Sequence, residues 1–177
     1  YDRAYGKTGW RAITIRSNSI GQGEILETPL QMANQAACIA NGGYYITPHL
    51  NKADSMLEHR HEVDIDAAYF DMVKAGMHLV MTNGTGRHYN IDSLQMCGKT
   101  GTAQNSHGKD HAIFVGFAPM DSPKIAVAVV VENSGFGATW AAPVASMMIE
   151  LLLCVLFSKN TYIDVIVLFH RLSSKAI

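Results

Sequence analysis

The stretch "CGKTGTAQNSHGKDHAIFVGFAPMDSPKIAVAVVVEN", residues 97–133, decides the architecture that we expect for this chain. Its apolar, β-branched and aromatic runs, extended back to residue 94, predict strands over 94–102, 112–119 and 124–132. The turn-like tetrapeptide "MDSP" joins the last two of these runs. The run 125–131 is apolar throughout, which indicates a strand that is covered on both faces.

Upstream of these strands, the sequence predicts a helix that begins after Thr28. Thr28 is a capping residue, Pro29 suits the first helical position, and Gln31 stands three residues after the cap, as in a capping box. "NGG" at 41–43 ends the helix, because glycine accepts the left-handed geometry found at helix ends. The small apolar stripe expected to face the core consists of Leu30, Ala33, Ala37 and Ala40.

A second helix is predicted from Asp66 to about Met81, and "TNGTG" ends it. A short strand is expected within 44–50, a surface excursion over 51–64, and a last helix from about Pro143. The apolar residues of the second helix recur at three- and four-residue steps, at Phe70, Val73, Met77 and Val80.

The expected order is therefore helix, strand, helix, three strands and helix, which predicts an α+β fold with a mainly antiparallel sheet flanked by helices. A length of 177 residues, 48% of them hydrophobic and 16% charged, suits one domain or most of a larger one. The net charge is −1, without a long run of one sign, so nucleic-acid binding is not expected.

Cysteine and histidine spacing indicates neither a disulfide framework nor a metal site, and we expect no cofactor. His107 and His111 follow the first of the three strands and are candidates for substrate contact. No stretch reaches the roughly 18–20 apolar residues of a membrane-spanning helix. The chain starts at Tyr1 rather than at methionine, so we expect an upstream part of a longer protein to precede it.

The triplet Lys-Thr-Gly occurs twice, at 7–9 and at 99–101. A phosphate-binding Walker A loop needs a glycine five residues before its Gly-Lys pair, but Tyr1 and Ser93 stand at those positions, so this loop is excluded. Acyl transfer of the β-lactam type also uses Lys-Thr-Gly, together with a Ser-x-x-Lys and a second serine motif.

Residues 99–102 suit acyl-transfer chemistry. A strand edge can pair with an extended peptide as an additional strand, and Gly101 lets the peptide backbone approach closely. Lys99 places a cation near the carboxylate of a peptide terminus, and Thr100 can hydrogen-bond to that carboxylate. The backbone N–H of Thr102 can serve in an oxyanion hole.

The segment "SIGQGEILETPLQMANQAACIANGGYYITPHL" (19–50), followed by "CGKTGTAQ" and the two apolar strands, closely resembles a known family. Over roughly residues 5–150 the chain resembles the C-terminal part of the transpeptidase domain of class B penicillin-binding proteins of the elongation type (penicillin-binding protein 2). The resemblance implies a β-lactamase/transpeptidase-like fold, here as an incomplete domain. It also implies a substrate-binding set of Lys99, Thr100, Gly101 and Thr102, whereas Lys7-Thr8-Gly9 has no family counterpart and is interpreted as a coincidence.

The family implies a serine-type DD-transpeptidase that cross-links peptidoglycan stem peptides ending in D-Ala-D-Ala and that is acylated by β-lactams. It also implies a parent protein with a periplasmic catalytic domain, anchored in the bacterial inner membrane by an upstream helix. Its partners would be the cell-wall synthesis proteins of the elongation machinery, which determine cell shape. A β-lactam-sensing receptor domain and a non-catalytic remnant are the alternative interpretations.

The family's nucleophilic serine has no counterpart in these residues. The one Ser-x-x-Lys, Ser106 to Lys109, follows the KTGT strand and is interrupted by Gly108, and Ser158-Lys-Asn160 is likewise out of order. Ser17-Asn18-Ser19 has the right composition but the wrong spacing. We therefore expect the catalytic serines to lie upstream and the isolated fragment to be inactive.

The family pattern divides the chain in two. Residues 1–150 are interpreted as the C-terminal portion of a transpeptidase domain, and 151–177 as an atypical tail whose apolar runs show no clear helical stripe. An aberrant gene end and a genuine extra packing element are both open interpretations of this tail.

Overall fold

The computed structural model of the chain describes residues 6, 11–49, 59–156 and 164–171. Two short 3₁₀ turns, Arg87–Tyr89 and Asp92–Leu94, precede the main sheet. The helices and strands, in chain order, are α2 (Ala12–Asn18), α3 (Pro29–Ala40), β1 (Tyr44–Ile46), β2 (Arg60–Glu62), α4 (Ala67–Thr82), β3 (Cys97–Ala103), β4 (His111–Ala118), β5 (Ile125–Glu132), α5 (Gly137–Leu156) and β6 (Asp164–Arg171).

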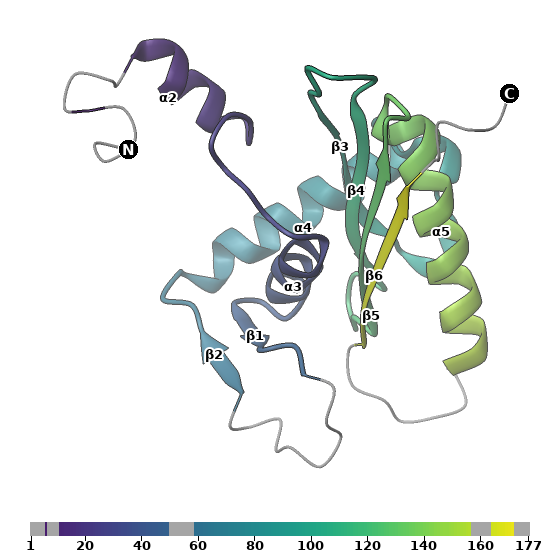
Figure 1. The fold of residues 1–177 in the computed structure, drawn as a ribbon. Helices are drawn as coiled ribbons and strands as arrows, with labels where there is room; N and C mark the ends of the chain where they lie inside the picture. Colours follow the sequence, from purple (N-terminus) through teal and green to yellow (C-terminus); the bar gives the residue numbers. More distant parts are fainter. Residues whose placement is uncertain (1–5, 7–10, 50–58, 157–163, 172–177) are drawn as a thin grey trace, which may run out of the picture.

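The main sheet has four strands in the order β3-β4-β5-β6, with helices on both faces (Figure 1). Strands β3, β4 and β5 are antiparallel neighbours, whereas β6 lies parallel to β5. Helix α5 packs on one face, and α3 and α4 pack on the other (Figure 1). The expected α+β class and the three predicted consecutive strands are therefore confirmed, and β3 forms one edge of the sheet.

The core between α5 and the sheet is built around Phe114 on β4. Its ring lies over two glycines, because a Cβ atom on Gly98 would stand 2.7 Å from Cε2 of the ring and one on Gly116 would stand 2.8 Å from Cε1. The residues that pack with Phe114 on this face include Val127, Val129, Ala141, Ala145 and Ile149, all fully buried. Every residue of β5 except Glu132 is buried, as its uninterrupted apolar run predicted.

Helix α3 begins with the expected capping box. The Thr28 N–H donates to Gln31 Oε1 at 2.8 Å, and the Gln31 N–H donates to Thr28 Oγ1 at 3.3 Å. At the other end, Gly42 and Gly43 have φ of +73° and +116°. Three of the four predicted stripe residues are buried, but Leu30 is 44% exposed, because the helix meets the sheet only from Ala33 onward.

Helix α4 begins at the expected cap, where the Asp66 carboxylate accepts a hydrogen bond from the Ala68 N–H at 2.9 Å. Phe70 and Met77 are buried as predicted. Of the other two residues of this apolar repeat, Val73 is 45% exposed and Val80 is half-buried. The buried residues of α4, which packs beside β3, are Phe70, Met77 and Met81.

Helix α5 begins at Gly137, six residues before the predicted start, so Pro143 lies inside the helix rather than at its first position. A Cβ atom on Gly137 would collide with the carbonyl oxygens of Gly101 and Ile113. The absence of a side chain therefore lets α5 start directly against β3 and β4.

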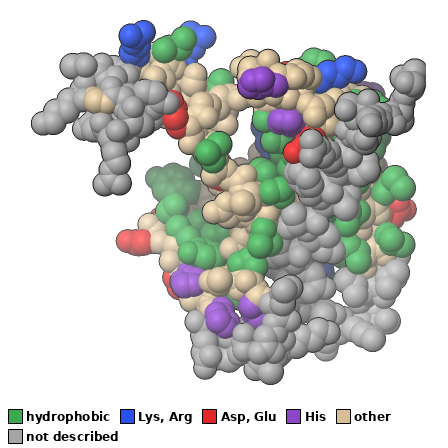
Figure 2. Space-filling model, in the orientation of Figure 1, with side chains coloured by type: hydrophobic (Ala, Val, Ile, Leu, Met, Phe, Trp, Pro, Cys, Tyr) green, Lys and Arg blue, Asp and Glu red, His purple; other side chains and the backbone are tan. Residues whose placement is uncertain are grey.

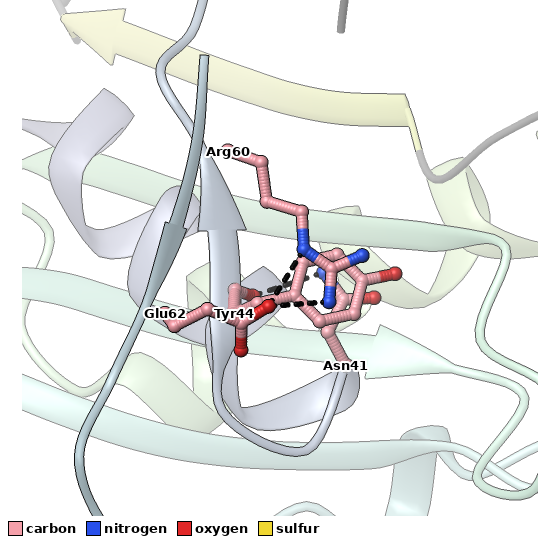
Figure 3. Close-up of polar contacts among 4 residues, drawn as sticks. All are labelled: Asn41, Tyr44, Arg60 and Glu62. Carbon is pink, nitrogen blue, oxygen red and sulfur yellow. Dashed lines mark hydrogen bonds and ion pairs between the residues drawn. The ribbon is translucent and has the colours of Figure 1, made fainter. Parts of the chain in front are cut away.

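The β1–β2 hairpin was not expected, since residues 60–62 were assigned to a surface excursion. The strands pair in the register Tyr44↔Glu62, and histidine side chains gather over this hairpin at the lower left of Figure 2. Figure 3 shows the Arg60 guanidinium over the Tyr44 ring, 3.8 Å from its centroid, and bonded to Glu62 at 2.6 Å. Asn41 donates to the Tyr44 carbonyl at 3.2 Å. Polar contacts thus stabilise a strand that has no apolar alternation.

The segment 151–177 contributes to two elements. Residues 151–156 continue α5, and Asp164–Arg171 form β6, which pairs with β5 from Ile125↔Asp164 to Glu132↔Arg171. This strand was not predicted, because its sequence follows an apolar run without a clear period.

Candidate functional site

The Lys-Thr-Gly-Thr residues 99–102 lie within β3, on the edge of the sheet that no other strand of the described residues pairs with, called the free edge below. The side chain of Lys99 is exposed, whereas Thr100 is only 9% exposed. Gly101 and Thr102 are half-buried. An exposed cation and a sheltered hydroxyl are therefore carried by successive residues of a strand that, among the described strands, pairs on one side only.

The backbone of β3 presents alternate residues to this unpaired side. The Thr102 carbonyl accepts a hydrogen bond from Gln22 Nε2 at 3.1 Å, so it points away from β4. In an antiparallel strand the N–H and C=O of one residue point to the same side, and successive residues alternate. The N–H and C=O of Thr100 and Thr102 therefore face the free edge, while those of Lys99 and Gly101 face β4.

The Thr100 side chain has a partner outside the strand. Its hydroxyl lies 2.7 Å from the hydroxyl of Thr85, in the turn after α4. The Lys99 ammonium donates to the Thr100 carbonyl. Both contacts hold polar groups of β3 at the edge where a ligand would approach.

The ends of the free edge are engaged by two other segments. His78 Nδ1 on α4 lies 2.8 Å from the Met96 carbonyl, just before β3, and this contact requires a proton on that nitrogen. Gln22, between α2 and α3, engages Thr102 at the other end. A Cβ atom on Gly101 would stand 3.3 Å from Cβ of Ile113, its partner on β4, so the glycine avoids crowding between the two strands.

The turn between β3 and β4 is held by polar contacts. The Asn105 N–H donates to the Asp110 carboxylate at 3.2 Å, and the Asn105 amide donates to Asn133 Oδ1 at 2.7 Å. His111 Nδ1 accepts from the Asn133 N–H at 3.1 Å. This network ties Nδ1 of His111 to the segment between β5 and α5.

Ser106, in the one Ser-x-x-Lys of the chain, lies in the same exposed turn. Its hydroxyl is 2.9 Å from Nδ1 of the neighbouring His107, and no contact described for this turn joins it to Lys109. Ser19 donates to the Arg16 carbonyl at 2.8 Å and closes the end of α2. Lys7-Thr8-Gly9 and Ser158-Lys-Asn160 lie outside the described residues.

Cys97 is the first residue of β3 and is fully buried. Burial raises the pKa of its thiol from 9.0 to about 12, against a smaller opposing effect of Lys74. Its sulfur lies 3.6 Å from the Lys74 carbonyl. A thiol that stays protonated and enclosed is structural rather than nucleophilic.

Within the described ranges, no three His, Cys, Asp or Glu side chains are grouped closely enough to hold a metal ion. His49 stacks on His59 and His61 on Tyr45, with ring centroids 4.8 and 4.9 Å apart, at the β1–β2 hairpin. Over the same part of the chain, no helix is long and apolar enough to cross a membrane.

Sequence reasoning missed Gln22, Thr85 and His78 as neighbours of the edge strand. Gln22 lies within the Ile-Gly-Gln-Gly segment, where the flanking glycines were a signal of special backbone geometry. Thr85 was interpreted only as part of a helix stop, and the sequence near His78 gives no sign of its contact with Met96.

The penicillin-binding protein transpeptidase domain family matches residues 2–150. The peptidoglycan D,D-transpeptidase MrdA of Haemophilus influenzae is 37% identical over 171 residues, which is 81% of this chain and 26% of that protein. MrdA of Acinetobacter baumannii is 36% identical over 159 residues, 76% of this chain and 24% of that protein. The chain thus spans about a quarter of the length of these curated relatives.

Solved structures show the same fold. The PBP2 of Pseudomonas aeruginosa, in complex with WCK 5153, matches with a TM-score of 0.70 and 33% identity over 92% of this chain and 37% of that chain. Penicillin-binding protein A of M. tuberculosis, as a ceftriaxone acyl-enzyme complex, matches with a TM-score of 0.65 and 32% identity over 76% of this chain and 34% of that chain.

Proposed function

Because the chain belongs to the class B penicillin-binding protein transpeptidase family, we propose that it supplies the substrate-binding edge strand of a peptidoglycan DD-transpeptidase. The resemblance expected from its sequence is confirmed by the family match over residues 2–150. The observation that carries the functional proposal is the free edge of β3, where the outward backbone groups of Thr100 and Thr102 stand beside the Lys99 cation.

The proposed ligand is a stem peptide that ends in D-Ala-D-Ala. Its terminal carboxylate would lie at the Lys99 ammonium and the Thr100 hydroxyl, because a cation and a donor favour a carboxylate. The carbonyl of the penultimate residue would then face the Thr102 N–H, which would stabilise the oxyanion that forms when this carbonyl is attacked. Gly101 would let the peptide backbone approach the strand closely.

The nucleophile of this reaction would be a serine on a part of the parent protein other than these residues. The relative from M. tuberculosis was solved as an acyl-enzyme, which supports a covalent serine mechanism for the parent. The curated relatives are named transpeptidases, and this favours cross-linking over a β-lactam-sensing receptor. We place the parent at the periplasmic face of the inner membrane, with the elongation machinery of wall synthesis as its partner.

Two measurements test the proposal. Incubation with a fluorescent penicillin, followed by denaturing electrophoresis, should leave the isolated chain unlabelled, and stoichiometric labelling of a serine in this chain would show that the nucleophile is present. Titration of the ¹⁵N-labelled chain with acetyl-D-Ala-D-Ala should shift the amides of residues 99–102. The matched control is the same dipeptide with a C-terminal amide, which should bind more weakly, and equal shifts with both ligands would refute the role of Lys99 and Thr100.

The alternative of a non-catalytic remnant that folds poorly has its own test. Circular dichroism should show a cooperative thermal transition, because the core between α5 and the sheet is closely packed. A melt without a transition would favour the remnant.

A further inference from the structure

Gln22 joins the edge strand from a segment 80 residues away in sequence. It follows the C-terminal end of α2, where its own N–H donates to the Ser17 carbonyl at 3.0 Å. Its side-chain amide then reaches β3, and Nε2 donates to the Thr102 carbonyl at 3.1 Å. Neither the proposed carboxylate contacts nor the proposed oxyanion contact involves Gln22.

The backbone around Gln22 is shaped for this reach. Gly21 and Gly23 have φ of +74° and +79°, in the left-handed region that residues with side chains rarely adopt. A Cβ atom on Gly23 would also stand 2.8 Å from Asn18 Oδ1, on the last turn of α2. The two glycines therefore direct the intervening side chain toward the strand.

The Thr102 carbonyl is also the acceptor that a bound peptide would need. A residue placed opposite Thr102 in a hydrogen-bonded antiparallel pair exchanges both bonds with it. Its carbonyl accepts from the Thr102 N–H, and its own N–H donates to the Thr102 carbonyl. Under the proposed function, the penultimate residue of the stem peptide occupies this place, and the Gln22 amide already holds one of its two bonds.

We propose that the side-chain amide of Gln22 donates to the Thr102 carbonyl in place of a substrate amide. When the peptide binds, its N–H displaces the Gln22 amide from this oxygen. This inference rests on the proposed function of β3. The exchange replaces one neutral N–H donor by another at the same oxygen, so it can proceed without leaving the carbonyl unpaired. Gln22 thereby keeps the Thr102 carbonyl hydrogen-bonded while no peptide is bound, and it lowers the apparent affinity for peptides that carry this N–H.

The test compares Gln22→Ala with the unmodified chain and with a matched control, Gln35→Ala. Gln35 is an exposed glutamine on α3 that is remote from β3 in sequence and has no side-chain hydrogen bond among the described contacts. Each ¹⁵N-labelled protein is titrated with acetyl-D-Ala-D-Ala and with the analogue that is N-methylated at the penultimate residue. Thermal melts confirm that all three proteins are folded.

Gln22→Ala should bind acetyl-D-Ala-D-Ala about fivefold more tightly than the unmodified chain, as one freed hydrogen bond allows. It should gain nothing for the N-methyl analogue, which cannot donate at that position, and Gln35→Ala should behave as the unmodified chain. In the unmodified chain, the dipeptide should also shift the side-chain amide signals of Gln22.

If the dipeptide shifts residues 99–102 but Gln22→Ala binds it no more tightly, the carbonyl accepts both donors at once and the inference about Gln22 is wrong, while the proposed function stands. If no ligand shifts these amides in any of the proteins, the proposed function of β3 fails and the inference fails with it. A fivefold gain for both ligands would also refute the inference, because it would not depend on the peptide N–H.

Discussion

Replacing Gly137 with alanine should destabilise the chain, although alanine is the better helix former. The added Cβ atom would collide with the carbonyl oxygens of Gly101 and Ile113 and would stand 3.0 Å from the Gly101 nitrogen. All three are backbone atoms of paired strands, which cannot rotate away as a side-chain end can. The first turn of α5 would have to move off β3 and β4.

The expected size follows from two opposing effects. Overpacking of this kind costs about 1–3 kcal/mol, and the contacts here involve backbone, so we take the upper half of that range. The helix propensity of alanine offsets at most about 1 kcal/mol. We expect a net loss of about 1–3 kcal/mol in the free energy of unfolding, which lowers Tm by about 2–12 °C for a domain of this size.

Gly76→Ala provides the control, because it makes the same chemical change in the middle of α4, where no atom outside the helix backbone lies within 4 Å of the new Cβ. It should raise the stability by about 0.5–1 kcal/mol. The assay is urea and thermal unfolding followed by circular dichroism. An unchanged or raised Tm for Gly137→Ala would show that α5 does not start against β3 and β4 as described.

Three further predictions concern single side chains. Thr28→Ala should remove the capping box of α3 and lower the free energy of unfolding in urea by about 1 kcal/mol. The control Thr139→Ala, at an exposed threonine at the start of α5, should change it by no more than about 0.5 kcal/mol. Equal losses in the two variants would contradict the role of Thr28 as a cap. Lys99→Met should leave the thermal melt unchanged and weaken the binding of acetyl-D-Ala-D-Ala about 2- to 5-fold. The binding of the same dipeptide with a C-terminal amide should stay the same. An equal loss of affinity for both ligands would contradict carboxylate recognition by Lys99. Cys97, as the one thiol of a Cys38→Ser/Cys154→Ser variant, should resist iodoacetamide at pH 8 until the protein unfolds, because its pKa is raised to about 12. Since its folded pKa lies above 9.0, its contribution to stability should be complete below pH 9 and lost as the pH rises from 9 to 12, and fast labelling of the native protein would refute this.

The elements that local sequence signals specify were predicted well. The capping box at Thr28, the glycines after α3 and the apolar run of β5 each act within a few residues of the structure they determine. The sequence order of β3, β4 and β5 also predicted the antiparallel part of the sheet.

The elements that were missed depend on contacts between distant residues. Strand β2 reads Arg-His-Glu, without apolar alternation, and it pairs with β1 through backbone bonds and the contact between Arg60 and Tyr44. The start of α5 follows from the close approach of Gly137 to β3, which the nearby Pro143 concealed. In the candidate site, the strand that carries Lys99 to Thr102 was predicted, but its contact with Gln22 spans 80 residues and has no local signature.

The open edge of β3 has a consequence for solubility. A strand with outward backbone donors and acceptors can pair with another protein molecule as readily as with a peptide, and such edges are starting points for aggregation. Lys99 places a charge in the middle of that edge, and a charge there discourages two copies from meeting strand to strand. Lys99, which is proposed to attract a carboxylate, would thus also keep β3 from pairing with β3 of a second molecule. A neutral side chain at position 99 should therefore make concentrated solutions of the chain prone to precipitate.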